Sequence, residues 1–162
     1  MKTRKLVILA MLSAISVAGS IFVSFPAGIA RAYPIQHAVN VITAVLFGPA
    51  AAVMVAFVTA AVRIITGTGS LLAFPGGMIG ALLAGLWYVK SGKVWAAAIG
   101  EVVGTGILAS LIAVPYAKLL MGTDVAALFF MPPFLVSSLS GAILGAVIVR
   151  RLLLAHSKLS LY

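Results

Sequence analysis

The sequence predicts an all-α integral membrane protein, a bundle of six transmembrane helices with both termini cytoplasmic. Of the 162 residues, 64% are hydrophobic and only 8% are charged, whereas soluble domains carry about 25% charged residues. A chain this short cannot hide so much apolar surface in a soluble core. The chain has eleven Lys and Arg residues but only two acidic residues. In a membrane protein this excess marks cytoplasmic helix ends, so we expect no nucleic-acid partner.

The composition also excludes several function classes. The chain has no cysteine, so disulfides and thiol chemistry are impossible. A spanning helix needs about 20 residues, so six spans leave almost no room for a nucleotide-hydrolysing domain. We therefore expect residues 1–162 to form one multi-pass domain in the lipid bilayer of the cell membrane.

The first apolar segment, Leu6–Phe25, follows Lys2, Arg4 and Lys5. This pattern is also typical of a cleaved signal peptide, and Ala30-Arg31-Ala32 resembles a cleavage site. The run is long enough to span the membrane, and the segments after it are equally apolar. We therefore interpret it as the first span.

The second apolar stretch, Ala38–Ile65, is interrupted by Gly48-Pro49. One kinked helix there would give five spans in total, whereas a helix hairpin would give six. Proline disfavours helix at the residue before it, which permits a tight turn without requiring one. The later spans are predicted at 72–89, 94–117 and 131–149.

The charges decide between five and six spans. With six spans, most cations lie at cytoplasmic ends, as the positive-inside rule demands; they are Lys2, Arg4, Lys5, Lys90, Lys93, Arg150, Arg151 and Lys158. Arg31, Lys118 and Asp124 then lie outside. Five spans would move five of these cations to the outside, so we predict six spans; the five are Lys90, Lys93, Arg150, Arg151 and Lys158.

Small residues recur at four-residue spacing in several spans, and such rows let helix backbones approach closely. They are Gly76, Gly80 and Ala84; Gly100 and Gly104; and Ser137, Gly141 and Gly145. We expect them to pack the bundle. Ala10, Ala14 and Ala18 form a similar row in the first span, where internal packing is again the simplest interpretation.

Arg63 and Glu101 are the charged residues that fall clearly inside spans, where a charge costs about 2.5–3.5 kcal/mol on insertion scales. At 1.5 Å per residue, Arg63 lies near the outer face and Glu101 nearer the inner one. About 15 Å along the membrane normal would separate them in a 30 Å slab, so we expect no direct ion pair. Arg63 then either snorkels outward or serves a site, and Glu101 is either packed or hydrogen-bonded to a neighbouring helix.

Polar and aromatic side chains gather at the outer ends of the spans. Aromatic walls with a few convergent polar groups describe a small-molecule pocket, with Glu101 and Thr105 as its floor. A single histidine at a helix start is alternatively only interfacial. The predicted substrate-binding residues are Gln36, His37, Asn40, Arg63, Thr66, Phe74, Glu101, Thr105, Phe134 and Ser137.

Catalytic chemistry is poorly supported. Gly67-Thr68-Gly69 lacks the lysine and the spacing of a phosphate-binding loop, and His37 has no second histidine nearby for a zinc motif. Two acids leave little for paired-carboxylate catalysis. We expect no catalytic residues, no metal and no cofactor, although a small intramembrane enzyme or a membrane scaffold stays open as an alternative.

Several runs together give the chain a resemblance to the substrate-binding S components of energy-coupling factor (ECF) vitamin transporters, and among them to the ThiW family. Besides the alanine row, they are 25–32, 33–40, 63–69, 72–76, 100–106 and 132–138. The resemblance implies capture of hydroxyethylthiazole, a thiamine precursor, from outside, with the first outer loop as a lid. Thiamine itself, a pyrimidine or another vitamin is the alternative ligand.

The resemblance also implies partners. An S component has no ATPase of its own and docks on a transmembrane coupling protein that carries two ATP-binding subunits. ATP hydrolysis topples the S component and releases the substrate inside. The alanine motif of the family maps onto Ala10, Ala14 and Ala18 as the docking face.

Overall fold

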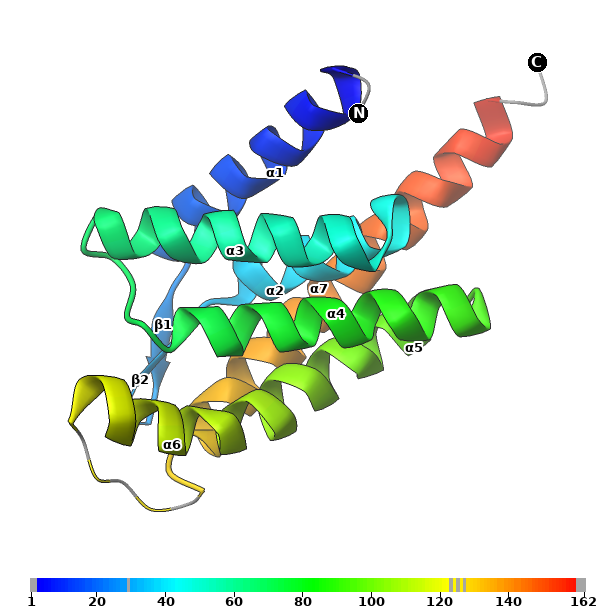
Figure 1. Ribbon diagram of the computed structural model, residues 1–162. Coiled ribbons are helices and arrows are strands. Elements are labelled where there is room, and N and C mark those ends of the chain that lie inside the picture. Colours follow the sequence, from blue (N-terminus) through cyan, green and yellow to red (C-terminus); the bar gives the residue numbers. More distant parts are fainter. Residues whose placement is uncertain (1–2, 29, 123, 125, 127, 160–162) are drawn as a thin grey trace.

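The computed structural model describes residues 3–28, 30–122, 124, 126 and 128–159, and they form a helical bundle with one small β-hairpin (Figure 1). Lys2 lies outside the described residues, and so does the side chain of Lys158. The elements are α1 (Thr3–Phe22), β1 (Phe25–Ala27), β2 (Ala30–Ala32), α2 (Pro34–Phe47), α3 (Pro49–Ile65), α4 (Ala73–Ser91), α5 (Val94–Glu101), the π-helix η1 (Val102–Ala109), α6 (Ser110–Met121) and α7 (Met131–Leu159).

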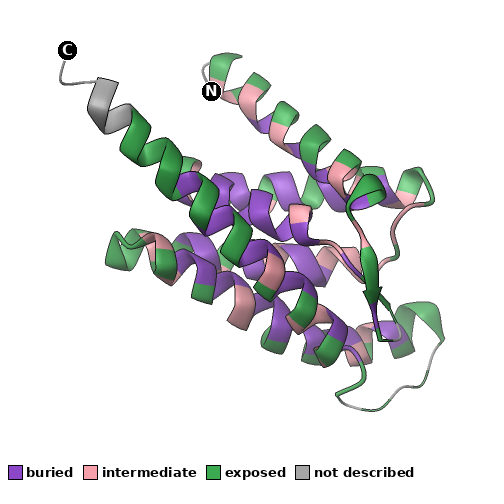
Figure 2. Ribbon diagram, turned by 180° about the vertical axis from the view of Figure 1, so that it is seen from behind, coloured by how far each residue is buried: buried purple, intermediate pink, exposed green. Residues whose placement is uncertain are grey.

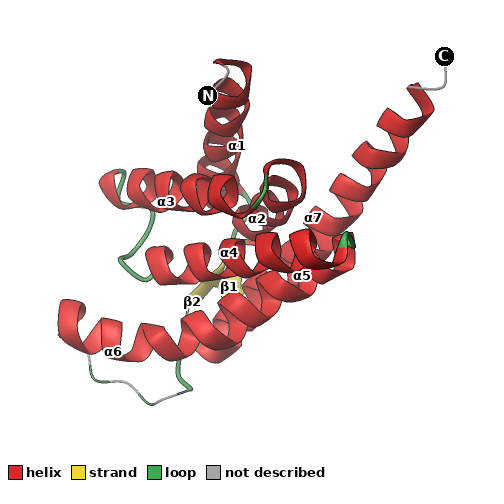
Figure 3. Cartoon of the chain, turned by 45° about the vertical axis from the view of Figure 1, so that its right-hand side comes forward, coloured by secondary structure: helices red, strands yellow, loops and turns green. Residues whose placement is uncertain are grey.

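The first helix ends at Phe22, three residues before the predicted boundary at Phe25. Proline pushes its predecessor towards extended backbone, and Pro26 therefore favours the strand that begins at Phe25. The strands β1 and β2 pair antiparallel, with Phe25 opposite Ala32. This hairpin, shown as strands in Figure 3, is an addition to the predicted all-α fold.

The apolar stretch around Gly48 is a helix hairpin rather than one kinked helix. Gly48 has φ 85° and ψ 177°, a left-handed φ that glycine adopts without steric cost, and Pro49 opens α3 where a missing N–H is harmless. The helices α2 and α3 pack side by side (Figure 1). The predicted hairpin is therefore confirmed.

The segment from Val94 to Met121 is one continuous helical rod, longer than predicted. It runs through α5, η1 and α6 and includes Pro115. Its middle, η1, is a π-helix. Such segments are rare and often occur at functional sites.

Small residues bring the helices into contact, as predicted. A Cβ on Gly104 would lie 2.7 Å from the Cα of Gly80, and a Cβ on Gly141 would lie 2.3 Å from the backbone oxygen of Pro34. These rows therefore join η1 to α4 and α7 to α2. The short helix α2 is buried along most of its length at the centre of the bundle (Figure 2).

Within the described part of the chain, three helical segments are long and apolar enough to cross a membrane: Thr3–Phe22, Val94–Met121 and Met131–Ala155. The helices α2 and α3 are shorter and equally apolar in character. The start of α1 and the end of α7 lie at the end of the bundle that carries the α2–α3 and α4–α5 turns, and the β-hairpin lies at the other end (Figure 1). Below we call the end with the β-hairpin the hairpin end.

Candidate functional site

A cavity of about 350 Å³ opens at the hairpin end of the bundle. Six elements or connections wall it: β2, the start of α2, the end of α3 with the loop after it, the start of α4, η1 and the start of α7. The lining residues are Ala30, Arg31, Tyr33, Gln36, His37, Arg63, Gly67, Thr68, Gly69, Ser70, Leu72, Ala73, Gly76, Gly77, Thr105, Phe130, Pro133, Phe134 and Ser137.

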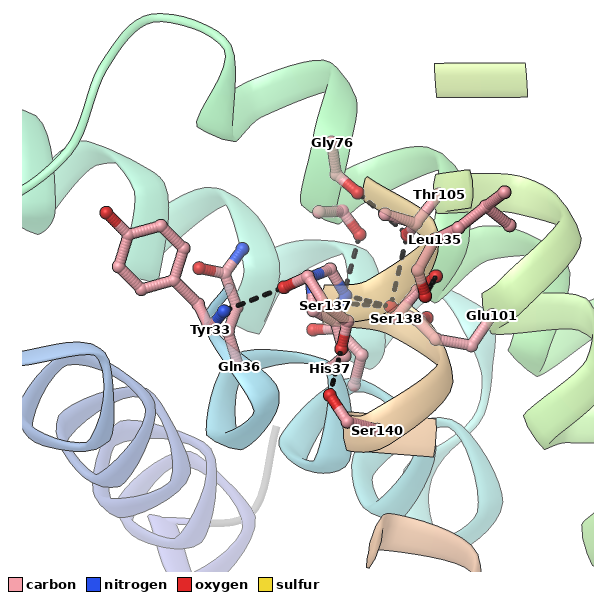
Figure 4. A network of polar contacts seen from close by, with 12 residues as sticks. Tyr33, Gln36, His37, Gly76, Glu101, Thr105, Leu135, Ser137, Ser138 and Ser140 are labelled. Atoms are coloured by element: carbon pink, nitrogen blue, oxygen red, sulfur yellow. Dashed lines mark hydrogen bonds and ion pairs between the residues drawn. The ribbon is translucent and has the colours of Figure 1, made fainter. Parts of the chain in front are cut away.

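A buried polar network forms the deep wall of this cavity (Figure 4). His37 Nδ1 lies 2.7 Å from Glu101 Oε1, and both residues are buried, at 5% and 0% exposure. Asn40 Nδ2 donates to the same oxygen at 3.0 Å, and Thr105 Oγ1 donates to it at 3.3 Å. Glu101 is therefore hydrogen-bonded to a neighbouring helix, one of the two roles expected for it.

This network exists because α2 carries its polar residues on the side that faces α4 and α5. His37 and Asn40 are three residues apart, so they share one helical face. Asn40 Nδ2 also donates to Gly77 O at 3.1 Å, and Thr105 Oγ1 donates to Gly76 O at 2.8 Å. The backbone carbonyl oxygens of Gly76 and Gly77 are therefore hydrogen-bond acceptors of the network.

A glycine in α4 also makes room for the network. A Cβ on Gly80 would lie 2.1 Å from Thr105 Oγ1 and 2.8 Å from Glu101 Oε1. The small-residue row of α4 therefore serves the site as well as helix packing.

Arg63 occupies a second corner of the cavity, and its exposure is only 2%. Its Nη1 donates to Gln36 Oε1, and its Nη2 donates to Thr68 O at 3.1 Å. Its Cζ lies 3.9 Å from the centroid of the Tyr33 ring, a cation–π arrangement. The alternative that Arg63 only snorkels outward is wrong, because the side chain is enclosed.

Arg63 and Glu101 do not form the direct ion pair that their predicted depths argued against. Within the part of the chain that the structure describes, the ion pair of Glu101 is with His37 and that of Asp124 is with Lys118. The alternative that His37 is merely interfacial is also wrong, because its ring is buried against Glu101.

The ten predicted substrate-binding residues divide into three groups. Six line the cavity: Gln36, His37, Arg63, Thr105, Phe134 and Ser137. Asn40 and Glu101 lie behind that lining, where they hold His37.

Thr66 and Phe74 lie outside the cavity lining. The exposed Thr66 hydroxyl donates to Val62 O, 2.9 Å away in the last turn of α3. The ring of Phe74 packs on Phe57 of α3, with centroids 5.4 Å apart. Both side chains therefore contact neighbouring residues of the protein and do not line the cavity.

Tyr33 lines the cavity without having been predicted, whereas Thr68 and Phe130 line it as members of the polar and aromatic cluster expected at the outer ends of the spans. Tyr33 directly precedes the proline that opens α2, and its backbone N–H donates to Ser137 Oγ at 2.8 Å. Phe130 lies one turn before Phe134, and their ring centroids are 6.1 Å apart. That four-residue aromatic spacing was the signal available in the sequence.

The cavity is rich in hydrogen-bond donors and is positively charged. Arg31 and Arg63 both line it, and none of its lining residues is Asp or Glu. Aromatic rings on one side and donors on the other suit a small, flat, polar ligand.

Comparison with curated proteins finds no match. A family model described as "Thiamine-precursor transporter protein (ThiW)" matches residues 6–155, from α1 to α7.

Proposed function

The chain belongs to the ThiW family of thiamine-precursor transporter proteins, and on this premise we propose that it captures hydroxyethylthiazole as the S component of an ECF importer. It is a multi-pass protein of the cell membrane, as its family and its long apolar helices show. We propose six spans with both termini cytoplasmic, which places the cavity at the outer face.

The observation that carries the proposal is the cavity at the hairpin end, with aromatic rings on one wall and convergent polar groups on the others. Its volume of about 350 Å³ lies at the small end of ligand sites, which suits a single five-membered ring with a short side chain. Phe134 and Phe130 are placed to stack on the ring. In this proposal His37 and Ser137, which line the cavity, hydrogen-bond the ring nitrogen and the hydroxyl.

The proposed partners are a transmembrane coupling protein and two ATP-binding subunits. Ala10, Ala14 and Ala18 are exposed on α1, turned away from its buried serines. An exposed row of small residues supports close helix packing against another membrane protein. In this proposal the β-hairpin is the lid, and ATP hydrolysis by the partners topples the chain to release the ligand inside.

The direct test is thermal stabilisation of the purified protein by hydroxyethylthiazole, thiamine and the pyrimidine precursor. A ligand at 100 times its dissociation constant stabilises a protein by about 2.7 kcal/mol, which is readily measured. We expect the thiazole to raise the unfolding temperature and the other two to have less effect. A shift with thiamine or the pyrimidine alone would contradict the assigned ligand, and no shift with any of the three would contradict the binding function.

Co-expression with a coupling protein and its two ATP-binding subunits tests the transport role. We expect the four components to purify as one complex and to accumulate thiazole in vesicles only when ATP is supplied. Thiazole uptake by the isolated chain at the rate of the complex would contradict the S-component assignment.

A further inference from the structure

Arg63 is a buried cation that has no acidic partner among the residues that the structure describes. The whole chain contains two acidic residues. Glu101 pairs with His37 at 2.7 Å, and Asp124 pairs with Lys118 at 2.9 Å. Both acids are therefore engaged elsewhere, although burying a charge without a counter-charge is costly.

The hydrogen bonds of Arg63 use two of the five N–H donors of its guanidinium. Its Nη1 and Nη2 donate to the neutral oxygens of Gln36 and Thr68. Its Nε is buried and has no hydrogen-bond partner among the described residues. Arg63 lines the cavity, so its guanidinium can donate its remaining N–H groups to an acceptor that belongs to a ligand.

The surroundings hold this guanidinium in place. The Tyr33 ring covers one face. The loop after α3 also packs closely on the side chain, because a Cβ on Gly69 would lie 2.9 Å from Arg63 Cβ and 3.6 Å from Nε. Fixed donors in a low-dielectric site bind an anion more strongly than mobile, solvated ones do.

A second guanidinium lines the same cavity from the hairpin. Arg31 donates through Nε and Nη2 to Ser24 Oγ at 3.1 and 2.8 Å, and through Nη2 to Ser24 O at 3.1 Å. These bonds tie the exposed Arg31 to the end of α1 at the cavity wall. Two cations and no carboxylate on the lining favour a negative ligand over a neutral one.

We propose that the ligand which this cavity prefers is a thiazole bearing an anionic oxygen group, a carboxylate or a phosphate monoester, that accepts hydrogen bonds from the Arg63 guanidinium. This inference rests on the proposed function, from which it takes the thiazole ring of the ligand. It adds that the ligand is negatively charged. In this arrangement the ring stacks on the aromatic wall, and Arg31 attracts the anion towards the site.

The test compares three probes by titration calorimetry on the full-length wild-type protein. They are hydroxyethylthiazole, its phosphate monoester, and the same thiazole carrying an acetate in place of the hydroxyethyl group. We expect at least one anion to bind about tenfold or more tightly than the alcohol, because hydrogen bonds to charged groups are the stronger ones. Tighter binding of the alcohol than of both anions would overturn the inference and leave the proposed function standing.

Variants then test whether Arg63 causes the tighter binding of the anion. Arg63→Gln should make the affinities for the anionic thiazole and the alcohol equal, and Arg63→Lys should keep part of the difference between them. Lys118→Gln, which removes an exposed cation outside the cavity lining, should leave this difference unchanged. If Arg63→Gln does not fold, the test rests on Arg63→Lys, which must lower the ratio of the affinity for the anionic thiazole to the affinity for the alcohol. An unchanged ratio would overturn the inference, and failure of every thiazole to bind would overturn the proposed function with it.

Discussion

Removing the side chain of Glu101 should destabilise the protein by about 2–4 kcal/mol. Asn40 and Thr105 keep backbone acceptors at Gly77 and Gly76 after Glu101→Ala. His37 Nδ1 loses the partner that the structure gives it, and one unpaired buried donor costs about 1–3 kcal/mol. The cavity left by the missing side-chain atoms adds about 1 kcal/mol.

The matched variant Glu101→Gln keeps an oxygen acceptor at the same place. We expect it to lose less stability than Glu101→Ala, because the amide oxygen accepts from His37 and Asn40 as the carboxylate does and no cavity is left. Some loss remains, since the amide NH₂ takes the place of Oε2, which is buried without a partner among the described residues. Both variants should be unfolded in mixed micelles by titration with dodecyl sulfate and followed by circular dichroism. Thr59→Val serves as the control, since it removes a buried hydroxyl that has no partner among the described residues and should not destabilise the protein.

Two results would refute this reasoning. If Glu101→Gln were as damaging as Glu101→Ala, the negative charge rather than the acceptor would hold the network. If Glu101→Ala changed stability no more than the control does, the network would contribute nothing to the fold. Affinity for hydroxyethylthiazole, measured on the same samples, should follow stability, because Glu101 holds a histidine that lines the cavity.

Three further predictions follow from packing. Gly104→Ala should destabilise the bundle by about 1–3 kcal/mol in the same unfolding assay, because its Cβ would meet the backbone of α4; an unchanged stability would refute this. Phe134→Ala should weaken thiazole binding by about 1 kcal/mol in calorimetry, whereas Phe74→Ala, outside the cavity lining, should leave affinity unchanged; equal losses would contradict the mapping. Ala14→Trp should block co-purification with the coupling protein and spare ligand binding, while Leu139→Trp, on an exposed position of α7, should block neither; normal co-purification of Ala14→Trp would exclude that docking face.

The helices and the α2–α3 hairpin were predictable because their signals are strong and local. Apolar length identifies a span without reference to the rest of the chain. The choice between a kink and a hairpin at Gly48-Pro49 needed only the distribution of Lys and Arg. The small-residue rows were predictable for the same reason, since their four-residue spacing depends only on helix geometry.

The π-helix and the β-hairpin had no comparable signal. Nothing in Val102–Ala109 distinguishes a π register from an α register, because the difference lies in which backbone groups pair. The strands β1 and β2 have three residues each, too few for an alternating pattern. Pro26 favours extended backbone at Phe25, and Arg31 of β2 donates a hydrogen bond to Ser24, which lies just before β1.

The cavity wall could be predicted only in part, because helix rotation decides which side chains face inward. Phe74 and Gly76 are neighbours at the start of α4, yet Gly76 lines the cavity and Phe74 packs on Phe57. Arg63 and His37 were identifiable from the cost of burying polar groups in a membrane. Their partners were not, since Gln36 and Glu101 reach them from other helices.

The glycine wall of the cavity makes the size of the ligand adjustable. A Cβ on Gly76 would lie 3.4 Å from the Phe134 ring, and a Cβ on Gly77 would lie 2.8 Å from Gln36 Nε2. A methyl group at Gly76 would therefore fill space beside the aromatic wall in ordinary contact, without moving a helix. Single substitutions there offer evolution, or a designer, a way to retune which vitamin fragment is carried while the rest of the scaffold stays intact.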